Sequence, residues 1–203
     1  MNHLFEVAEF FGIIAFALSG FYAAAREKLD MLGIFIAAFL TALGGGITRD
    51  AIADEMPYTF THILPTFLVI GVVITAVLLR LNKHDKLEQT KIFIISDTLG
   101  LVSFAISGSL VGIGAGFNVF GIIMLGMITA VGGSCLRDIL LNKIPFFLIG
   151  EFYATVAIIV SFAMYVLKEF DQMNLISTVI VFAIGVTLRL VAYYKKWKLP
   201  KLS

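Results

Sequence analysis

A short string that combines adjacent glycines with an Arg-Asp pair occurs twice in this sequence, 88 residues apart. Gly44–Asp50 reads GGGITRD and Gly132–Asp138 reads GGSCLRD. The same offset of 88 joins the FALSG string at Phe16–Gly20 to FAISG at Phe104–Gly108. Between Gly12–Pro57 and its copy, 14 of 46 aligned residues are identical, without a gap. The chain is therefore an internal duplication, and any fold must contain the same unit twice.

The duplicated strings lie in a strongly apolar chain. Of its 203 residues 60% are hydrophobic, and the mean hydropathy is +0.99, whereas soluble domains are about 45–50% apolar. This composition predicts an integral membrane protein. The net charge of +1 gives no general attraction to nucleic acid, so no such partner is expected. The single cysteine, Cys135, excludes an intramolecular disulfide, and no Cys/His cluster predicts a metal site.

Seven segments are long and apolar enough, or nearly so, to cross a bilayer as helices, which takes about 20 residues each. Short loops join them and leave no room for a soluble domain. We therefore predict an all-α membrane protein with one membrane domain over residues 1–203. The expected spans are Val7–Ala25, Met31–Ile52, Ile63–Leu81, Ile92–Gly112, Phe117–Leu140, Ile149–Leu167 and Leu175–Tyr194.

The duplication assigns three spans to each copy, at about 7–81 and about 92–167, and leaves a seventh helix at about 175–194 without a counterpart. Because three is odd, the second copy enters the membrane from the opposite side. The copies are then inverted repeats, related by a pseudo-two-fold axis in the membrane plane. Transporters and channels use this architecture, with the working site near the midplane where the repeats meet.

Lysines and arginines gather on one side of this topology. The side that carries the N-terminus has few Lys or Arg residues other than Arg49 and Lys168. Because cytoplasmic loops are rich in Lys and Arg, we expect the N-terminus outside and the C-terminus in the cytoplasm. The opposite side receives Arg26, Lys28, Arg80, Lys83, Lys86, Lys91, Arg137, Lys143, Lys195, Lys196, Lys198 and Lys201.

The glycine runs lie about two-thirds along the second and fifth spans. Each interior glycine destabilises a helix by about 1 kcal/mol relative to alanine, so we expect a bend or a short unwound stretch. Freed backbone groups cannot face lipid, and freed carbonyls at a half-helix end favour a cation. Thr41 and Thr129, three residues earlier, would add hydroxyl oxygens to an aqueous path. The alternative is close helix packing without any pore. The candidate pore kinks are Gly44, Gly45, Gly46, Gly132, Gly133 and Ser134.

An Arg-Asp pair follows each glycine run, Arg49-Asp50 in the first copy and Arg137-Asp138 in the second. The predicted topology puts one pair near each mouth of the path. Adjacent residues on a helix do not face each other, so we expect partners on other helices rather than a salt bridge within each pair. Charges at this depth are candidates for function, here a closed gate latched by arginine hydrogen bonds. The alternative is that the arginines extend to the membrane interface.

Other polar residues lie within the spans. Glu9 and Asp97, also 88 apart, lie near the starts of the first and fourth spans, either as caps favoured by the helix dipole or as a cation site at a subunit or repeat interface. Ser19 and Ser107 in the FALSG-like strings would line the path or allow tight helix contact. Arg189 in the last span is expected to extend toward the basic tail.

The sequence contains none of the motifs typical of enzymes, such as GxxxxGK, HExxH or a nucleophile elbow. We therefore expect neither an enzyme nor a cofactor. Three function classes remain open: a passive cation channel, a secondary transporter of a small amino acid such as glycine, and a membrane scaffold whose glycines only pack helices.

Two FALSG-like strings, each followed by GG-x-x-x-RD and a proline, resemble the prokaryotic relatives of the trimeric intracellular cation (TRIC) channels, also catalogued as putative glycine transporters. The resemblance covers about Gly12–Leu167. It implies a homotrimer in the lipid of a prokaryotic inner or cell membrane, with one hydrated pore per protomer that passes potassium or sodium. It also implies kinked second and fifth helices, and a closed state held by Arg49, Asp50, Arg137 and Asp138. Ser134 departs from the triple glycine, so the two halves would bend unequally.

Overall fold

The computed structural model describes residues 2–81, 86–149 and 152–197. Over these residues the chain folds into nine helices. In chain order they are α1 (Asn2–Arg26), α2 (Met31–Ile52), α3 (Tyr58–Thr61), α4 (Leu64–Leu78), α5 (Lys86–Gly114), α6 (Val119–Leu140), α7 (Phe146–Ile149), α8 (Tyr153–Glu169) and α9 (Leu175–Tyr194).

Five of these helices are long and apolar enough to cross a membrane, namely α1, α2, α5, α6 and α9. The predicted second and seventh spans match α2 and α9 at both ends. The 15-residue α4 and the 17-residue α8 take the places of the third and sixth predicted spans, but both are shorter than the about 20 residues that cross a bilayer. The prediction of an all-α, multi-pass membrane protein is confirmed, while the short helices α3 and α7 were not predicted.

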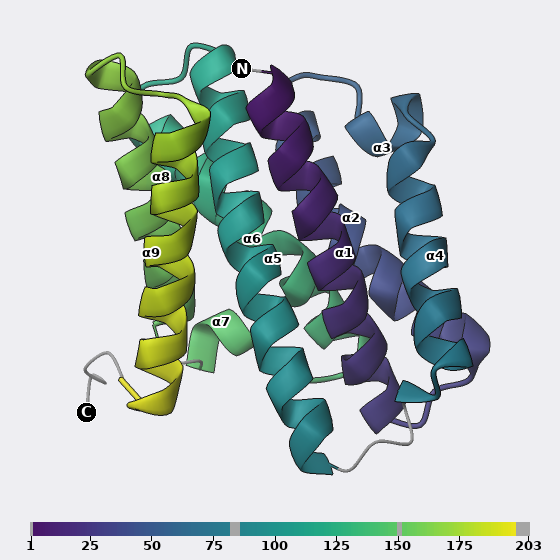
Figure 1. Cartoon of the computed structure of the whole chain (residues 1–203). Coiled ribbons are helices and arrows are strands. Elements are labelled where there is room, and N and C mark those ends of the chain that lie inside the picture. The colour runs from purple at the N-terminus through teal and green to yellow at the C-terminus, as the bar shows by residue number, and fades with distance from the viewer. Residues whose placement is uncertain (1, 82–85, 150–151, 198–203) are drawn as a thin grey trace.

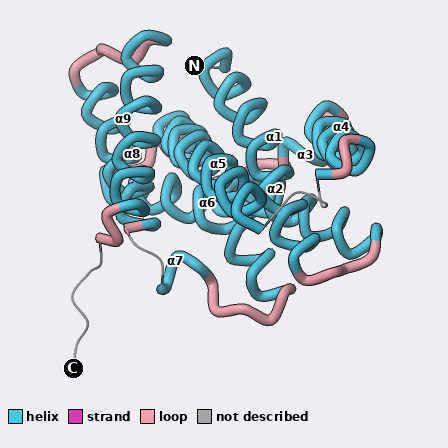
Figure 2. Tube along the Cα trace, turned by 60° about the horizontal axis from the view of Figure 1, so that its bottom comes forward, coloured by secondary structure: helices cyan, strands magenta, loops and turns pink. Residues whose placement is uncertain are grey.

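Helices α1 and α5 lie side by side at the centre of the bundle, with α2 and α6 packed behind them (Figure 1). Helix α4 flanks α1 and α2 on one side, and α8 and α9 flank α5 and α6 on the other (Figure 2). The short helices α3 and α7, which follow α2 and α6, lie at opposite ends of the molecule. The C-terminal ends of α2 and α6 therefore also lie at opposite ends.

The two copies match in local structure down to the helix caps. Helices α2 and α6 begin and end 88 residues apart. Before α2, Asp30 Oδ1 accepts a hydrogen bond from the Gly33 amide at 2.7 Å; before α6, Asn118 Oδ1 accepts one from the Gly121 amide at 2.9 Å. Because such caps satisfy first-turn amides, they fix where each helix begins.

Helices α1 and α5 meet through duplicated residues. The rings of Phe16 and Phe104, 88 residues apart, stack with their centroids 5.3 Å apart. A Cβ atom at Gly12 would lie 3.1 Å from the Phe104 ring, and one at Gly100 would collide with the Phe16 ring. The glycines are therefore retained in both copies because each makes room for the other copy's phenylalanine.

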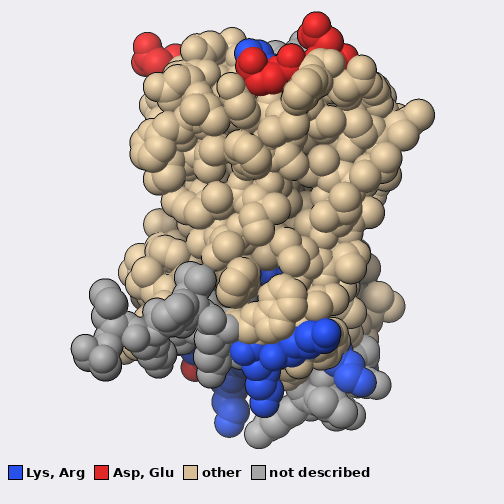
Figure 3. Space-filling view, turned by 90° about the vertical axis from the view of Figure 1, so that its left-hand side faces the viewer, with Lys and Arg blue, Asp and Glu red and all other residues tan. Residues whose placement is uncertain are grey.

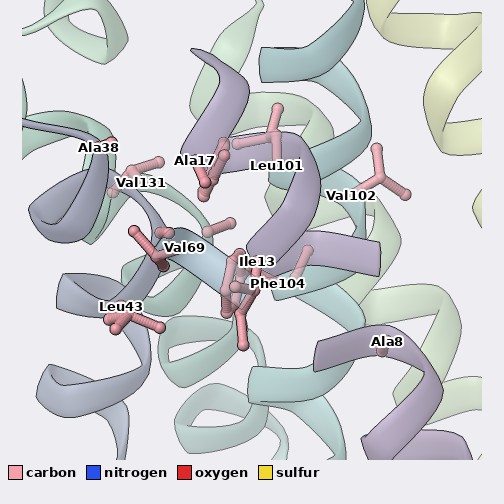
Figure 4. Packing of buried hydrophobic residues seen from close by; sticks show 14 of the residues in the cluster. Ala8, Ile13, Ala17, Ala38, Leu43, Val69, Leu101, Val102, Phe104 and Val131 are labelled. Carbon is pink, nitrogen blue, oxygen red and sulfur yellow. The ribbon is translucent and has the colours of Figure 1, made fainter. Parts of the chain in front are cut away.

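The buried core draws on both copies (Figure 4). Ile13 and Ala17 of α1 lie among Leu101 of α5, Val69 of α4 and Ala38 of α2. Outside this core, charge is segregated to the two ends. On the face seen in Figure 3, acidic side chains gather at one end, next to a single basic patch, and most of the visible Lys and Arg lie at the other, with an almost uncharged band between them. Such a band suits contact with lipid hydrocarbon.

Candidate functional site

The first polar cluster surrounds Arg49, near the C-terminal end of α2. Its side chain is 0% exposed. Nη1 donates to Glu9 Oε1 of α1 and to Ser107 Oγ of α5, the latter at 3.0 Å. Nε donates to Asp50 Oδ1 at 2.7 Å, and the guanidinium carbon lies 4.9 Å from the centre of the Phe5 ring. One guanidinium thus pairs with two carboxylates, which gives the cluster a formal charge of −1.

The second cluster repeats this arrangement around Arg137 at the opposite end of the bundle. Nη1 donates to Asp97 Oδ1 at 3.1 Å and to Ser19 Oγ at 3.0 Å. Nε donates to Asp138 Oδ1 at 2.8 Å, and the Phe93 ring centre lies 5.2 Å from the guanidinium carbon. Every member lies 88 residues from its counterpart, and the formal charge is again −1. Each cluster contains a serine from the other copy, so the clusters also join the two copies.

The second carboxylate oxygen of each aspartate anchors the short helix that follows. Asp50 Oδ2 accepts from the Tyr58 amide at 2.7 Å, and Asp138 Oδ2 accepts from the Phe146 amide at 2.8 Å. These amides lie at the starts of α3 and α7. Each aspartate therefore ties its cluster to the short helix at that end of the molecule.

Three predictions about these charges are corrected. Both arginines do pair with their neighbouring aspartates, because each Nε lies within hydrogen-bond distance of Oδ1 of the next residue. Neither arginine extends to the interface, since Arg49 is 0% and Arg137 is 1% exposed. Glu9 and Asp97 are not caps, because α1 begins at Asn2 and α5 at Lys86, well before them. Their carboxylates instead balance buried arginines.

The glycine runs do not interrupt their helices. Helices α2 and α6 are continuous through both runs, so the predicted unwound stretch is wrong, while the predicted bend stays a prediction. The runs mark the point where the two helices cross. A Cβ atom on Gly45 would collide with the carbonyl oxygen of Thr129, and one on Gly133 with that of Thr41. The backbones are in direct contact, so close helix packing, the alternative reading, accounts for these two glycines.

The remaining members of the runs differ between the copies. A Cβ atom on Gly44 would meet Leu136 Cδ1 at 2.6 Å, and one on Gly132 would meet Gly45 Cα at 3.2 Å. The nearest atoms to a Cβ atom on Gly46 would belong to Arg49 and Glu9, the first being Arg49 Nη2 at 3.6 Å. Its counterpart Ser134 donates to the Val131 carbonyl at 3.0 Å. The third position is therefore where the two halves diverge.

The threonines and the FALSG-like strings form a second contact. Thr41 Oγ1 donates to the Ala37 carbonyl, and Thr129 Oγ1 to the Leu125 carbonyl, both at 2.6 Å. A Cβ atom on Gly20 would meet Thr41 Oγ1 at 2.6 Å, and one on Gly108 would meet Thr129 Oγ1 at 2.5 Å. Both threonines are 0% exposed. The hydroxyls thus pack against α1 and α5, and the prediction that these strings allow tight helix contact is confirmed.

Several contacts of the two clusters could not be predicted from the sequence. Phe5 and Phe93 carry the same offset of 88, but they lie outside the Gly12–Pro57 window in which the copies were compared. Tyr153 and Arg189 join only the second cluster, so no repeat signal marks them. Tyr153 Oη makes a long hydrogen bond of 3.4 Å to Ser134 Oγ. Arg189 is 1% exposed and packs against aromatic rings, so the expectation that it extends to the tail is wrong.

A cavity of about 330 Å³ lies next to the first cluster, lined by Phe5, Glu6, Glu55, Tyr58 and neighbouring residues. Burial raises the pKa of the Tyr58 hydroxyl, and the charges of Glu6 and Glu9 raise it further, so the ring stays neutral. Two of the lining residues, Glu6 and Glu55, are acidic.

Comparisons with known proteins agree with this arrangement. A family model described as "Glycine transporter" matches residues 6–80 and 94–169. The crystal structure of a prokaryotic TRIC channel in 0.5 M KCl superimposes with a TM-score of 0.89 at 27% identity, over 98% of this chain and 100% of the other. A second structure, described as the structural basis for conductance through TRIC cation channels, superimposes with a TM-score of 0.84 at 33% identity. The match covers 98% of this chain and 97% of the other. The chain belongs to the TRIC channel family.

Relatives within this family include two bacterial membrane proteins of the group named UPF0126. YvgT of Bacillus subtilis is 31% identical over 98% of this chain and 96% of its own length. The inner membrane protein YadS of Escherichia coli K12 is 32% identical over 73% of this chain and 71% of its own length. The TRIC orthologue from Rhodobacter sphaeroides, at 23% identity and a TM-score of 0.87, shares the fold.

Proposed function

We propose that this protein is a passive, potassium-permeable cation channel, with a hydrated pathway through each protomer centred on α2 and α6. The observation that carries the proposal is the pair of buried arginine–carboxylate clusters at the two ends of this helix pair. Each cluster is closed in the structure, since each guanidinium is buried and bonded to residues of other helices. The clusters act as two gates in series.

Opening follows from moving each guanidinium aside. Once Arg49 leaves, Glu9 and Asp50 remain as two carboxylates at the first mouth; once Arg137 leaves, Asp97 and Asp138 remain at the second. Rings of acidic side chains attract cations and repel anions. The sequence contains no TVGYG-like filter, so ions cross hydrated and discrimination between potassium and sodium is modest.

The glycine runs serve this mechanism by letting the helices bend about their crossing. Gly45 and Gly133 keep the backbones of α2 and α6 in contact, which provides a pivot between the two gates. Ser19 and Ser107 link each gate to the opposite copy, so the gates move with α1 and α5. The permeant ion is the only ligand the mechanism requires, and no resident cofactor takes part.

The proposed topology has seven spans, arranged as two inverted three-helix repeats plus α9, with α4 and α8 as the third and sixth spans. The N-terminus lies outside and the C-terminus in the cytoplasm of a prokaryotic inner membrane. The segregation of exposed charge seen in Figure 3 supports this orientation. Likeness to TRIC channels supports a homotrimer. A reporter enzyme fused after Ser203 that is active only outside the cytoplasm would contradict the orientation.

The second candidate is a secondary transporter of glycine. The description of the matching family model favours it, and buried groups of both charges suit a zwitterion. Inverted repeats also fit alternating access. A membrane scaffold without transport is the third class.

Recording from purified protein in a planar bilayer separates these functions. A channel produces unitary currents. In a gradient of potassium chloride across the bilayer, their reversal potential lies near the equilibrium potential of potassium. Saturable uptake of labelled glycine into proteoliposomes without unitary currents would instead support the transporter. Absence of both activities from folded protein would support the scaffold and overturn the proposal.

A further inference from the structure

Arg189 lies on α9, the helix without a counterpart in the duplication, and its side chain is buried within the bundle. The guanidinium carbon lies over three aromatic rings. Its distances to the ring centres are 5.0 Å for Tyr153, 5.5 Å for Phe146 and 5.7 Å for Tyr193. A guanidinium is attracted to aromatic faces, and more strongly where both are removed from water. Arg189 therefore ties α9 to α7 and α8.

Two of these aromatic residues also form hydrogen bonds near the second cluster, Phe146 through its backbone amide and Tyr153 through its hydroxyl. The Phe146 amide donates to Asp138 Oδ2 at 2.8 Å, and Asp138 in turn pairs with Arg137. Tyr153 Oη lies 3.4 Å from Ser134 Oγ, in the glycine run of α6. Arg189 thus contacts both residues that fix the gate-bearing end of α6 from outside the cluster.

The first cluster lacks this support. The counterparts of Tyr153 and Ser134, 88 residues earlier, are Pro65 and Gly46, which offer neither an aromatic ring nor a hydroxyl. No helix corresponds to α9. Among the described residues, Arg49 Nη2 is a buried donor without a hydrogen-bond partner. The contact from α9 was therefore added to one gate only.

We infer that Arg189 is a positioning residue that couples α9 to the Arg137 gate and stabilises its closed state. The inference rests on the proposed channel function. Holding Phe146 and Tyr153 against α6 keeps Asp138 and Ser134 in register with Arg137. Opening of this gate requires α7 and α8 to move relative to α9, which separates the guanidinium from the rings.

Single-channel recording of Arg189→Met and Arg189→Lys tests the coupling. Methionine keeps the apolar stem but removes the cation, so the open probability rises by about threefold to tenfold, with the unitary conductance unchanged. Lysine, which keeps the charge but loses the planar face, gives a smaller rise.

Tyr153→Phe keeps the ring but loses the hydroxyl near Ser134, and it also raises the open probability. Ile184→Ala, at a residue of α9 that is 58% exposed, is the matched control and leaves gating unchanged.

Unaltered open probability in Arg189→Met overturns the inference, as does an increase equal to that of Ile184→Ala. A fall in melting temperature with unchanged gating also overturns it, since Arg189 would then be only structural. If Arg189→Met does not fold, Arg189→Lys and Tyr153→Phe decide the matter by the same measure. Silence of the wild-type protein overturns the channel function itself, which distinguishes that failure from a conducting channel whose gating ignores Arg189.

Discussion

The Arg49 and Arg137 clusters make equivalent arginine bonds, and they differ in the partner to which the bridging serine donates. At the second cluster, Ser19 Oγ accepts from Arg137 and donates to Asp97 Oδ1 at 2.9 Å, which closes a ring of hydrogen bonds. At the first, the hydroxyl of Ser107 points back to the Phe104 carbonyl, and Arg49 Nη2 has no partner among the described residues. A buried donor left unpaired costs about 1–3 kcal/mol. In the proposed mechanism, the first cluster therefore holds its closed state less strongly than the second.

This difference shows what a duplication preserves and what it leaves free. The backbone elements are the same at both ends, including the caps of α2 and α6 and the aspartates that hold α3 and α7. The side chains around the two clusters differ, most directly at Gly46 and Ser134. In the proposed mechanism, the two gates can therefore differ in the stability of their closed states without any change in the fold.

The largest expected effect comes from removing the arginine of the second cluster, where the serine closes a ring of hydrogen bonds. Arg137→Gln leaves Asp97 and Asp138 buried without their cation, and we expect a loss of about 3–5 kcal/mol in unfolding free energy. Arg49→Gln costs less, because that guanidinium already has an unpaired nitrogen. Denaturation of both variants in mild detergent compares them. Adding Asp97→Asn to Arg137→Gln restores part of the loss; equal losses at both ends would contradict the comparison.

A second prediction concerns the crossing that both gates share. Gly45→Ala and Gly133→Ala place a methyl group against a backbone carbonyl, so each variant should lose about 3 kcal/mol of stability, and the two losses should be alike. Gly71→Ala on α4 is the control, since a Cβ atom there has no other atom within 4 Å. Thermal unfolding in detergent measures all three. A crossing variant as stable as the control would show that the helices separate without cost.

The third prediction exchanges the residues that distinguish the ends. Gly46→Ser puts a hydroxyl near Arg49 Nη2 in a space that accepts a Cβ atom, and it should stabilise the protein by about 1 kcal/mol. The same change lowers the open probability by about fivefold, since 1.4 kcal/mol corresponds to a factor of ten. Ser134→Gly should act in the opposite direction. Parallel unfolding and single-channel measurements check the pair, and a destabilised Gly46→Ser protein would refute the role given to Arg49 Nη2.

The smallest effect is expected at the surface. Lys143, in the loop after α6, pairs with Glu27 at 2.5 Å, and both side chains are more than 40% exposed. The corresponding loop after α2 carries Glu55 instead. Glu27→Gln should change the unfolding free energy by less than about 0.5 kcal/mol, because exposed ion pairs contribute little. A larger loss in a denaturation series would mean that this pair, rather than the buried cluster, distinguishes the two ends.

The sequence was sufficient to predict the repeat, the all-helical membrane fold and the residues at the centre of both clusters. The offset of 88 marks Arg49, Arg137 and their aspartates because both copies need them. The sequence could not show that the glycines press two backbones together instead of breaking them. A glycine permits both unwinding and close approach, and only the position of the neighbouring helix decides between them.

The asymmetric parts of the site were harder to predict, for a physical reason. Tyr153 and Arg189 contribute through tertiary contacts made in one copy only, so neither periodicity nor repetition reveals them. The pairing of each arginine with its own neighbour was also hidden. It depends on how a long side chain curls, which the angular spacing of residues on a helix does not determine.

The central claim is that the two clusters close one cation pathway in series. Single-channel recordings in potassium chloride of the wild type, Arg49→Gln, Arg137→Gln and the double variant test it most directly. We expect each single change to raise the open probability, and the two effects to multiply in the double variant. A double variant that behaves like either single one, or an arginine whose loss leaves conductance and gating unchanged, would contradict it.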